Sequence, residues 1–289
     1  MSRRTGRNLM AAGLLALAAT ATAAAAEVET LKLADGAEMS YVARGSGEPA
    51  LVFVHCGNCR MSIWDESLAA FEGERRVVAM DLVGYGLSPS GPRESFTIEG
   101  YGADVAALVE HLGLAKVILV GNSLGGPVAL EAAKKLGAGR VLGVVAVDTL
   151  QNAEAEWPEE SWRKILDGYL ADFEGTCTSF MLQIVGREAS EAVRERVDRE
   201  TCDGDPAAAI ALFRTLREFD TGAAMRAAGV PIRAINAGVY PTAVEVNRKY
   251  APSFEVEVLE GVGHYPQVER PEEFQRALRA AVAALAAGR

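Results

Sequence analysis

Short apolar runs recur along the chain and predict buried strands. They cover residues 50–54, 76–80, 116–120, 141–147, 231–235 and 254–259. Unbroken runs of this kind are typical of strands that are covered on both faces, as in a parallel sheet. Segments with apolar residues at helical spacing lie between them, at residues 101–112, 124–136 and 271–287. The alternation predicts an α/β fold, with a mostly parallel central sheet flanked by helices.

Two regions depart from this alternation. Residues 27–44 fit an antiparallel opening hairpin, with Asp35 and Gly36 at the turn. Residues 151–229 are mostly helical, so we expect a helical cap inserted over one edge of the sheet, with the core formed by residues 27–150 and 230–289. We expect most aromatic residues of this cap to pack between helices, and one or two to face a substrate pocket; they are Trp157, Trp162, Tyr169, Phe173, Phe180 and Phe213.

Residues 1–26 have the pattern of a secretory signal rather than of folded structure. A basic start with Arg3, Arg4 and Arg7 precedes an Ala- and Leu-rich run that ends in Ala-Ala-Ala before Glu27. The run is short for a membrane anchor and rich in Ala rather than Leu, which favours cleavage. The Ser2-Arg3-Arg4 segment does not decide the export route. We expect an exported protein, periplasmic or secreted.

The charge balance limits the partners of the protein. The chain has a net charge of −10, and residues 1–26 carry no acidic side chain, so the remainder is more acidic still. An acidic surface argues against nucleic acid or anionic membrane as the main partner, and we expect no stable membrane insertion once the signal is removed. The expected partner is a small-molecule substrate.

Four cysteines are present: Cys56, Cys59, Cys177 and Cys202. In an exported protein they can form disulfides, with three possible pairings, and four free thiols are the alternative. The spacing Cys56-x-x-Cys59 is not accompanied by a second such pair or by a His-x-x-x-His pattern, so zinc is not expected. The sequence carries no signature for a metal, a nucleotide or another cofactor.

The strongest chemical signal is the segment Gly121-Asn122-Ser123-Leu124-Gly125-Gly126. It follows an apolar strand and opens an Ala-rich helix, which is the context of a nucleophile elbow. Glycines leave room for the sharp strand-to-helix turn that presents the serine hydroxyl above the sheet. Ser123 is therefore the predicted nucleophile, and the alternative is a glycine-rich turn with an inert serine.

Three further segments, together with this elbow, resemble the α/β-hydrolase superfamily over nearly all of the chain after residue 26. Val54-His55-Cys56-Gly57 resembles the oxyanion loop after the third strand, and Asp81 to Ser88 resembles the D-x-x-G-x-G-x-S loop after the fourth. Gly261-Val262-Gly263-His264 resembles the segment that delivers the catalytic histidine. The resemblance implies the α/β-hydrolase fold and a hydrolase activity.

His264 is the predicted general base. It follows the last predicted strand in a short glycine-flanked loop, from which a neutral imidazole can take the Ser123 proton and return it to a leaving group. The other two histidines fit other roles: His111 lies near a helix end, and His55 suits a structural hydrogen bond in the oxyanion loop.

The acid of the triad departs from the family pattern. The family usually places it after the strand before the last, but that stretch here has Tyr240 where an Asp is expected. Glu245 lies further on, within a predicted helix. Asp148, at the end of the preceding strand, is the predicted acid, as in some related dehalogenases and lipases; a Ser-His dyad is the alternative. Asp81 is interpreted as shaping its own loop.

The oxyanion hole also departs from the pattern, because Cys56 stands where glycine usually follows the histidine. Leu124 and Gly57 are the predicted donors through their backbone N–H groups, since acyl transfer needs two such donors.

The combination predicts a serine hydrolase that cleaves a small ester or related acyl substrate through an acyl-serine intermediate. A serine at the elbow excludes the dehalogenase and epoxide-hydrolase chemistry that uses Asp there. The alternatives are a carbon–carbon bond hydrolase, whose Gly-Asn-Ser-x-Gly-Gly segment resembles this elbow, and a slow-turnover ligand-binding or signalling member of the same fold.

Overall fold

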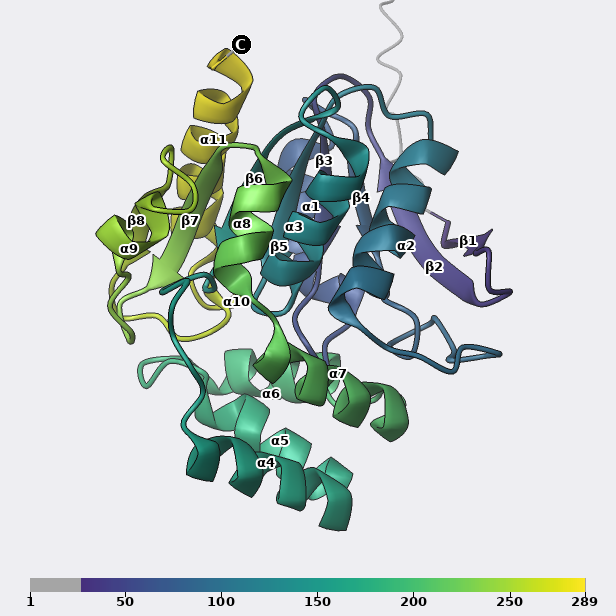
Figure 1. Cartoon of the computed structure of the whole chain (residues 1–289), viewed down its shortest axis with the longest axis vertical. Helices are drawn as coiled ribbons and strands as arrows, with labels where there is room; N and C mark the ends of the chain where they lie inside the picture. The colour runs from purple at the N-terminus through teal and green to yellow at the C-terminus, as the bar shows by residue number, and fades with distance from the viewer. Residues whose placement is uncertain (1–26, 289) are drawn as a thin grey trace, which may run out of the picture.

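The computed structural model describes residues 27–288, so the predicted signal at residues 1–26 lies outside the described residues. The eight strands are β1 (Glu29–Lys32), β2 (Glu38–Arg44), β3 (Ala50–Val54), β4 (Val77–Met80), β5 (Val117–Asn122), β6 (Val141–Val147), β7 (Ile232–Ala237) and β8 (Glu255–Leu259). They form one sheet in the order β1-β2-β4-β3-β5-β6-β7-β8 (Figure 1). The pairs β1–β2 and β2–β4 are antiparallel, and the other neighbouring pairs are parallel.

Helices cover both faces of this sheet. The core and connecting helices are η1 (Met61–Trp64), α1 (Asp65–Phe71), α2 (Ile98–His111), α3 (Gly125–Leu136), α8 (Thr221–Ala228), α9 (Val244–Arg248), α10 (Pro266–Glu269) and α11 (Pro271–Ala287). Figure 1 shows α2, α3 and α8 on the face toward the viewer and α11 behind the sheet. The predicted α/β architecture and the opening hairpin are confirmed.

Successive side chains of the central strands enter two separate cores, because a strand directs alternate residues to opposite faces. In β3, Val52 and Val54 pack with α2, α3 and α8, whereas Leu51 and Phe53 pack with α1 and α11. All five residues of β3 are buried. This explains why the central strands are apolar throughout rather than at every second position. The expectation of a buried strand at residues 254–259 is wrong, because β8 is an edge strand and is largely exposed.

Local sequence signals fix the ends of the helices that cover the sheet. The Thr97 hydroxyl accepts the Gly100 N–H at 3.0 Å and caps α2. Helix α11 begins with Pro271, whose missing backbone N–H costs nothing in the first turn because donors there have no partner within the helix. Glu272 follows in the same turn, where the helix dipole favours a negative charge. Helix α8 ends at Gly229, which has a φ of 61° that a side chain disfavours.

Four helices lie below the lower edge of the sheet in Figure 1, and we call these four helices the cap. They are α4 (Glu159–Ala171), α5 (Phe173–Gln183), α6 (Glu191–Glu200) and α7 (Pro206–Glu218). Stacking of Trp162 on Phe213, with parallel rings 6.1 Å apart, joins α4 to α7. The last helix of the range 151–229, α8, packs instead against α3 on the sheet. The cap is therefore α4–α7, and α7 contributes Ala208, Ala209 and Leu212 to the core cluster that also contains α2 and α3.

The four cysteines form two disulfides, Cys56–Cys59 and Cys177–Cys202. The first lies in the loop after β3, and the second joins α5 to the segment between α6 and α7. Within residues 27–288, no helix combines the length and the hydropathy needed to cross a bilayer. In the same range, no group of three or more His, Cys, Asp or Glu side chains is placed to hold a metal ion.

The packing of α11 gives a test of the core. Phe274 is fully buried, with its ring centre 6.2 Å from that of Trp64. Replacing Phe274 by Ala removes a buried ring and leaves a cavity, so we expect the free energy of unfolding to fall by about 3–5 kcal/mol. Urea unfolding measures this. Leu170→Ala is the control, because Leu170 is 56% exposed; a similar loss in both variants would contradict the assignment of this core.

Candidate active site

Ser123 lies on the sharp turn between β5 and α3. Its φ is 53°, in the left-handed region that disfavours a side chain, and its N–H donates to Val147 O at 3.0 Å. The turn is possible because the residues two positions before and after Ser123 are glycines: a Cβ on Gly121 would lie 2.0 Å from Gly125 O, and one on Gly125 would lie 2.4 Å from Val54 O. The structure therefore has the strained strand–turn–helix geometry of a nucleophile elbow.

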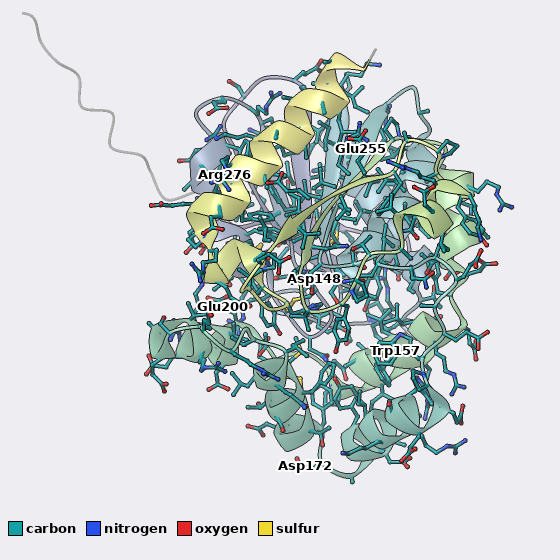
Figure 2. All side chains as sticks on the ribbon, turned by 90° about the vertical axis from the view of Figure 1, so that its left-hand side faces the viewer. Asp148, Trp157, Asp172, Glu200, Glu255 and Arg276 are labelled. Carbon is teal, nitrogen blue, oxygen red and sulfur yellow. A yellow bond between two sulfur atoms is a disulfide. The ribbon has the colours of Figure 1, made fainter. Side chains whose placement is uncertain are left out.

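Asp148 and His264 form a hydrogen-bonded pair at the edge of the sheet that faces the cap. His264 Nδ1 lies 2.7 Å from Asp148 Oδ2, although 116 residues separate them in the chain. An ionised carboxylate can only accept hydrogen bonds, so Nδ1 carries the proton and Nε2 keeps a free lone pair. Figure 2 shows Asp148 at the junction between the sheet and the cap helices. Both side chains are largely buried, with 18% of His264 and 8% of Asp148 exposed.

The neighbouring strand fixes the other oxygen of this carboxylate. Asp148 Oδ1 accepts the N–H of Ala237, the last residue of β7, at 3.0 Å and the side-chain amide of Gln151 at 3.2 Å. Asp148 follows β6, which pairs with β7 in register. An acid on β6 therefore reaches the place at the end of β7 where the family usually carries it.

The residue at the usual acid position, Tyr240, and the later carboxylate of Glu245 both lie away from the histidine contact. Tyr240 is 66% exposed. Glu245 belongs to α9, where its carboxylate accepts a hydrogen bond from Arg248 at 2.9 Å. Asp148 is thus the predicted acid that the structure brings to His264 Nδ1.

The side chain of Asn122 joins the three chain segments of the site. This buried residue directly precedes Ser123, and its Nδ2 donates to Val147 O at 2.8 Å and to His264 O at 3.3 Å. Its Oδ1 accepts from Gln267 Nε2 at 3.1 Å. The elbow, the end of β6 and the histidine loop are consequently held side by side.

Glu269 organises the loop that carries His264. Its Oε2 accepts the N–H of Gly263 at 2.8 Å and that of Gly186 at 3.1 Å, and its Oε1 accepts the N–H of Tyr265 at 3.1 Å. His264 N–H itself donates to Ile184 O at 2.9 Å. Because Gly186 and Ile184 follow α5, the cap helps to hold the histidine in place.

The side chain of His55, the first residue of the loop after β3, links this loop to the loop after β4. His55 Nδ1 lies 2.7 Å from Cys56 O, and its Nε2 accepts the Leu82 N–H at 2.9 Å. Complete burial lowers the pKa of His55, so the ring stays neutral and can make both bonds at once. The predicted structural interpretation of His55 fits these contacts.

The two residues predicted to donate to the oxyanion, Gly57 and Leu124, lie next to each other. A Cβ built on Gly57 would lie 3.7 Å from Leu124 Cδ2, an ordinary van der Waals contact. Gly57 is enclosed by the Cys56–Cys59 disulfide. Although Cys56 stands where the family has glycine, the backbone of this loop lies close to the elbow.

Asp81 shapes the loop after β4, as its position in the sequence predicts. Its carboxylate accepts the N–H groups of Met61 at 2.5 Å and Leu87 at 2.8 Å, and its main-chain oxygen accepts the Ser88 hydroxyl at 2.7 Å. Burial raises the pKa of Asp81, while the hydrogen bonds donated by the Leu87 and Met61 N–H groups oppose this rise.

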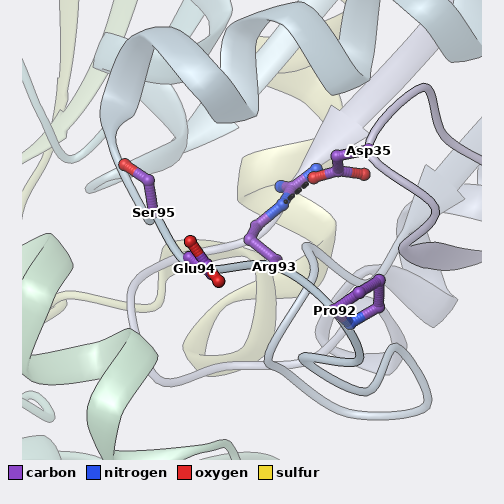
Figure 3. A pocket seen from close by; sticks show the side chains of 5 residues that line it. All are labelled: Asp35, Pro92, Arg93, Glu94 and Ser95. Atoms are coloured by element: carbon purple, nitrogen blue, oxygen red, sulfur yellow. Dashed lines mark hydrogen bonds and ion pairs between the residues drawn. The ribbon is translucent and has the colours of Figure 1, made fainter.

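A surface pocket of about 280 Å³ lies apart from these residues. It is lined by Asp35, Pro92, Arg93, Glu94 and Ser95 (Figure 3). Arg93 donates to Asp35 Oδ2 at 2.7 Å and to Asp104 Oδ1 at 3.0 Å, so carboxylates of this chain already satisfy its guanidinium. The triad candidates do not line this pocket, and we assign it no role.

The chain belongs to the alpha/beta hydrolase family, whose sequence profile matches residues 51–277. It is 31% identical to a non-heme haloperoxidase of Rhodococcus erythropolis over 212 residues, which are 68% of this chain and 76% of that protein. It is 24% identical to 3-oxoadipate enol-lactonase 2 of Acinetobacter baylyi over 259 residues, which are 87% of this chain and 95% of that protein. The predicted family and the predicted enzyme class, a hydrolase, are confirmed.

Solved structures share the fold. A thermophilic esterase from Thermogutta terrifontis superposes with a TM-score of 0.77 at 24% identity, covering 90% of this chain and 99% of that one. This likeness extends over the sheet and its helices, and it supports the fold assignment alone.

The contacts of Glu269 lead to a prediction about the histidine loop. Glu269→Gln replaces one carboxylate oxygen by a donor, which cannot accept from backbone N–H groups. We expect the free energy of unfolding to fall by about 1–3 kcal/mol. Glu273→Gln is the matched control, since Glu273 lies at the surface, 3.8 Å from Arg270. Equal stability of both variants in denaturant titrations would show that the Glu269 bonds contribute nothing.

Proposed function

We propose that the protein is a serine hydrolase that cleaves small esters or related acyl compounds through an acyl-Ser123 intermediate. One arrangement carries the proposal: Ser123 lies on a strained turn, and the residue before it, Asn122, is hydrogen-bonded to the main chain of His264, whose Nδ1 is bonded to Asp148. The enol-lactonase and the esterase described above are named for acyl carbon–oxygen chemistry, which supports the same reaction class here.

In the first half-reaction, Ser123 Oγ attacks the acyl carbon as its proton passes to His264 Nε2. Asp148 holds the imidazole in the required tautomer and stabilises the imidazolium that forms. The carbonyl oxygen becomes an oxyanion that accepts hydrogen bonds from Leu124 N–H and Gly57 N–H. When the tetrahedral intermediate collapses, the leaving alkoxide takes the proton from Nε2.

In the second half-reaction, water replaces the alcohol. His264 Nε2 takes a proton from this water as its oxygen attacks the acyl-serine carbon, and the proton then returns to Ser123 Oγ. The released products are a carboxylic acid and the regenerated enzyme. The same two backbone N–H donors stabilise the oxyanion in both half-reactions.

We also propose that the protein acts after export, in the periplasm or outside the cell. The basic and then apolar pattern of residues 1–26 supports this location. Two disulfides in the folded chain support it as well, because disulfides persist in oxidising compartments.

The nucleophile is tested with short p-nitrophenyl esters and a fluorophosphonate, which phosphonylates an activated serine with loss of fluoride. We expect the purified protein to release p-nitrophenol and to be labelled at Ser123, and Ser123→Ala to lose both properties. The hydroxyl is the bond-forming group, so a fall of at least about 10³-fold in kcat is expected. Turnover that persists in Ser123→Ala would refute the proposal, and a wild-type protein that is neither labelled nor active would favour a ligand-binding role.

The acid is tested with Asp148→Asn. An amide at this position donates toward Nδ1, favours the wrong imidazole tautomer and cannot stabilise the imidazolium, so we expect kcat to fall by about 10⁴-fold. Glu245→Gln is the control, because it makes the same chemical change on α9 and leaves the His264 contact intact. Loss of activity in Glu245→Gln but not in Asp148→Asn would overturn the assignment.

A further inference from the structure

The loop after β3, which includes Gly57 and its N–H group, is in contact with both the cap and the core. We propose that Tyr169, on cap helix α4, is a positioning residue for the oxyanion hole: its hydrogen bond to Asn58 fixes the loop that presents the Gly57 N–H. This inference rests on the proposed function, because the oxyanion hole belongs to the acyl-transfer chemistry proposed above.

The core fixes one side of this loop. Cys56 O and the Gly57 N–H belong to the same peptide unit and point in opposite directions when that unit is trans. Cys56 O is bonded to His55 Nδ1 at 2.7 Å and accepts the Cys59 N–H at 3.2 Å. These contacts orient the peptide before Gly57.

The cap fixes the other side through Asn58. This residue has a φ of 58°, and its Nδ2 donates to Tyr169 Oη at 3.1 Å. Its main-chain oxygen accepts the Cys202 N–H at 2.7 Å, and Cys202 is tied to α5 by the disulfide with Cys177. Asn58 therefore meets two elements of the cap, one through its side chain and one through its backbone.

Tyr169 is a rigid support for this contact. Its side chain is buried, and its ring centre lies 5.3 Å from that of Phe173 and 5.6 Å from that of Phe213. Burial raises the pKa of Tyr169 to about 12, so the hydroxyl stays neutral during an assay near neutral pH. Tyr169→Phe removes the hydroxyl and keeps the ring, which makes it a clean test.

A displaced oxyanion donor weakens binding of the transition state more than binding of the ester. For Tyr169→Phe we expect kcat on p-nitrophenyl acetate to fall roughly tenfold, while KM changes less than about twofold. A boronic acid that forms a tetrahedral adduct on Ser123 also places a negative oxygen in this hole. Its inhibition constant should rise by the same factor as kcat falls.

Two controls accompany this variant. Tyr250→Phe removes a hydroxyl that is bonded to Glu154 at the surface, at 3.1 Å, and should leave kcat unchanged. Fluorophosphonate labelling of Tyr169→Phe should reach the wild-type stoichiometry, because Ser123 is intact. Thermal unfolding of each variant shows that the fold is retained.

A double-mutant cycle identifies the contact through which Tyr169 acts. Asn58→Gly removes the amide but keeps a residue that adopts positive φ readily. We expect Asn58→Gly to lower kcat by a factor similar to that of Tyr169→Phe, and the double variant to lose no more than either single variant. Additive losses would show that Tyr169 acts by another route.

The outcomes separate this inference from the proposed function. An active enzyme whose kcat is unaffected by Tyr169→Phe would overturn the positioning role. A raised KM with unchanged boronic acid affinity would also overturn it, because Tyr169 would then contact the substrate. Failure of the proposed function itself would appear in the wild-type and Ser123→Ala proteins, before any cap variant is measured.

Discussion

The hydrogen bond between Asp148 and His264 is the contact on which the rest of the site depends. It requires that the ends of β6 and β7 lie side by side and that the loop after β8 returns over them. The central strands provide this order, because β3, β4, β5 and β6 are buried along their whole length and β7 is buried at all but one position. The Ala237 N–H donates to Asp148 Oδ1, and Oδ2 of the same carboxylate accepts the bond from the imidazole. The sheet thus acts as the frame that brings together residues far apart in the chain.

Backbone strain is concentrated around this frame. Among residues 27–288, the positive-φ residues other than glycine are Asn58, Ser123, Asp148, Leu150 and Cys202. Ser123 and Asp148 belong to the proposed machinery, Asn58 and Leu150 lie within two residues of it in the chain, and Cys202 is bonded to Asn58 from the cap. Such conformations cost about 1–3 kcal/mol apiece and persist only where the surroundings determine them. Here, the strand ends, the two disulfides and buried amide side chains hold the backbone in these conformations. The segments around the site must therefore be rigid.

The sequence predicted the elements that have local signals and missed those that depend on distant contacts. The elbow at Ser123 and the loop of His264 stand out because glycines must flank them, and Asp148 followed once the usual acid position proved to hold Tyr240. The Asn58–Tyr169 bond spans 111 residues and the Gly186–Glu269 bond spans 83. Neither partner carries a pattern that names the other. The return of α8 to the core was hidden for the same reason, since a helix that packs on the sheet and a helix of the cap have similar periodicity.

The hydrogen bonds of the cap argue against treating it as an independent lid. It meets the oxyanion side of the site through Asn58 and the histidine side through Ile184 and Gly186. Swinging α4–α7 away as one body would break both sets of bonds and release the two loops that the proposed acyl transfer requires to stay fixed. Substitutions in the cap should therefore affect the chemical step as well as substrate binding. Substitutions in a cap that only controlled substrate access would change binding alone, whereas this cap also positions loops of the candidate active site.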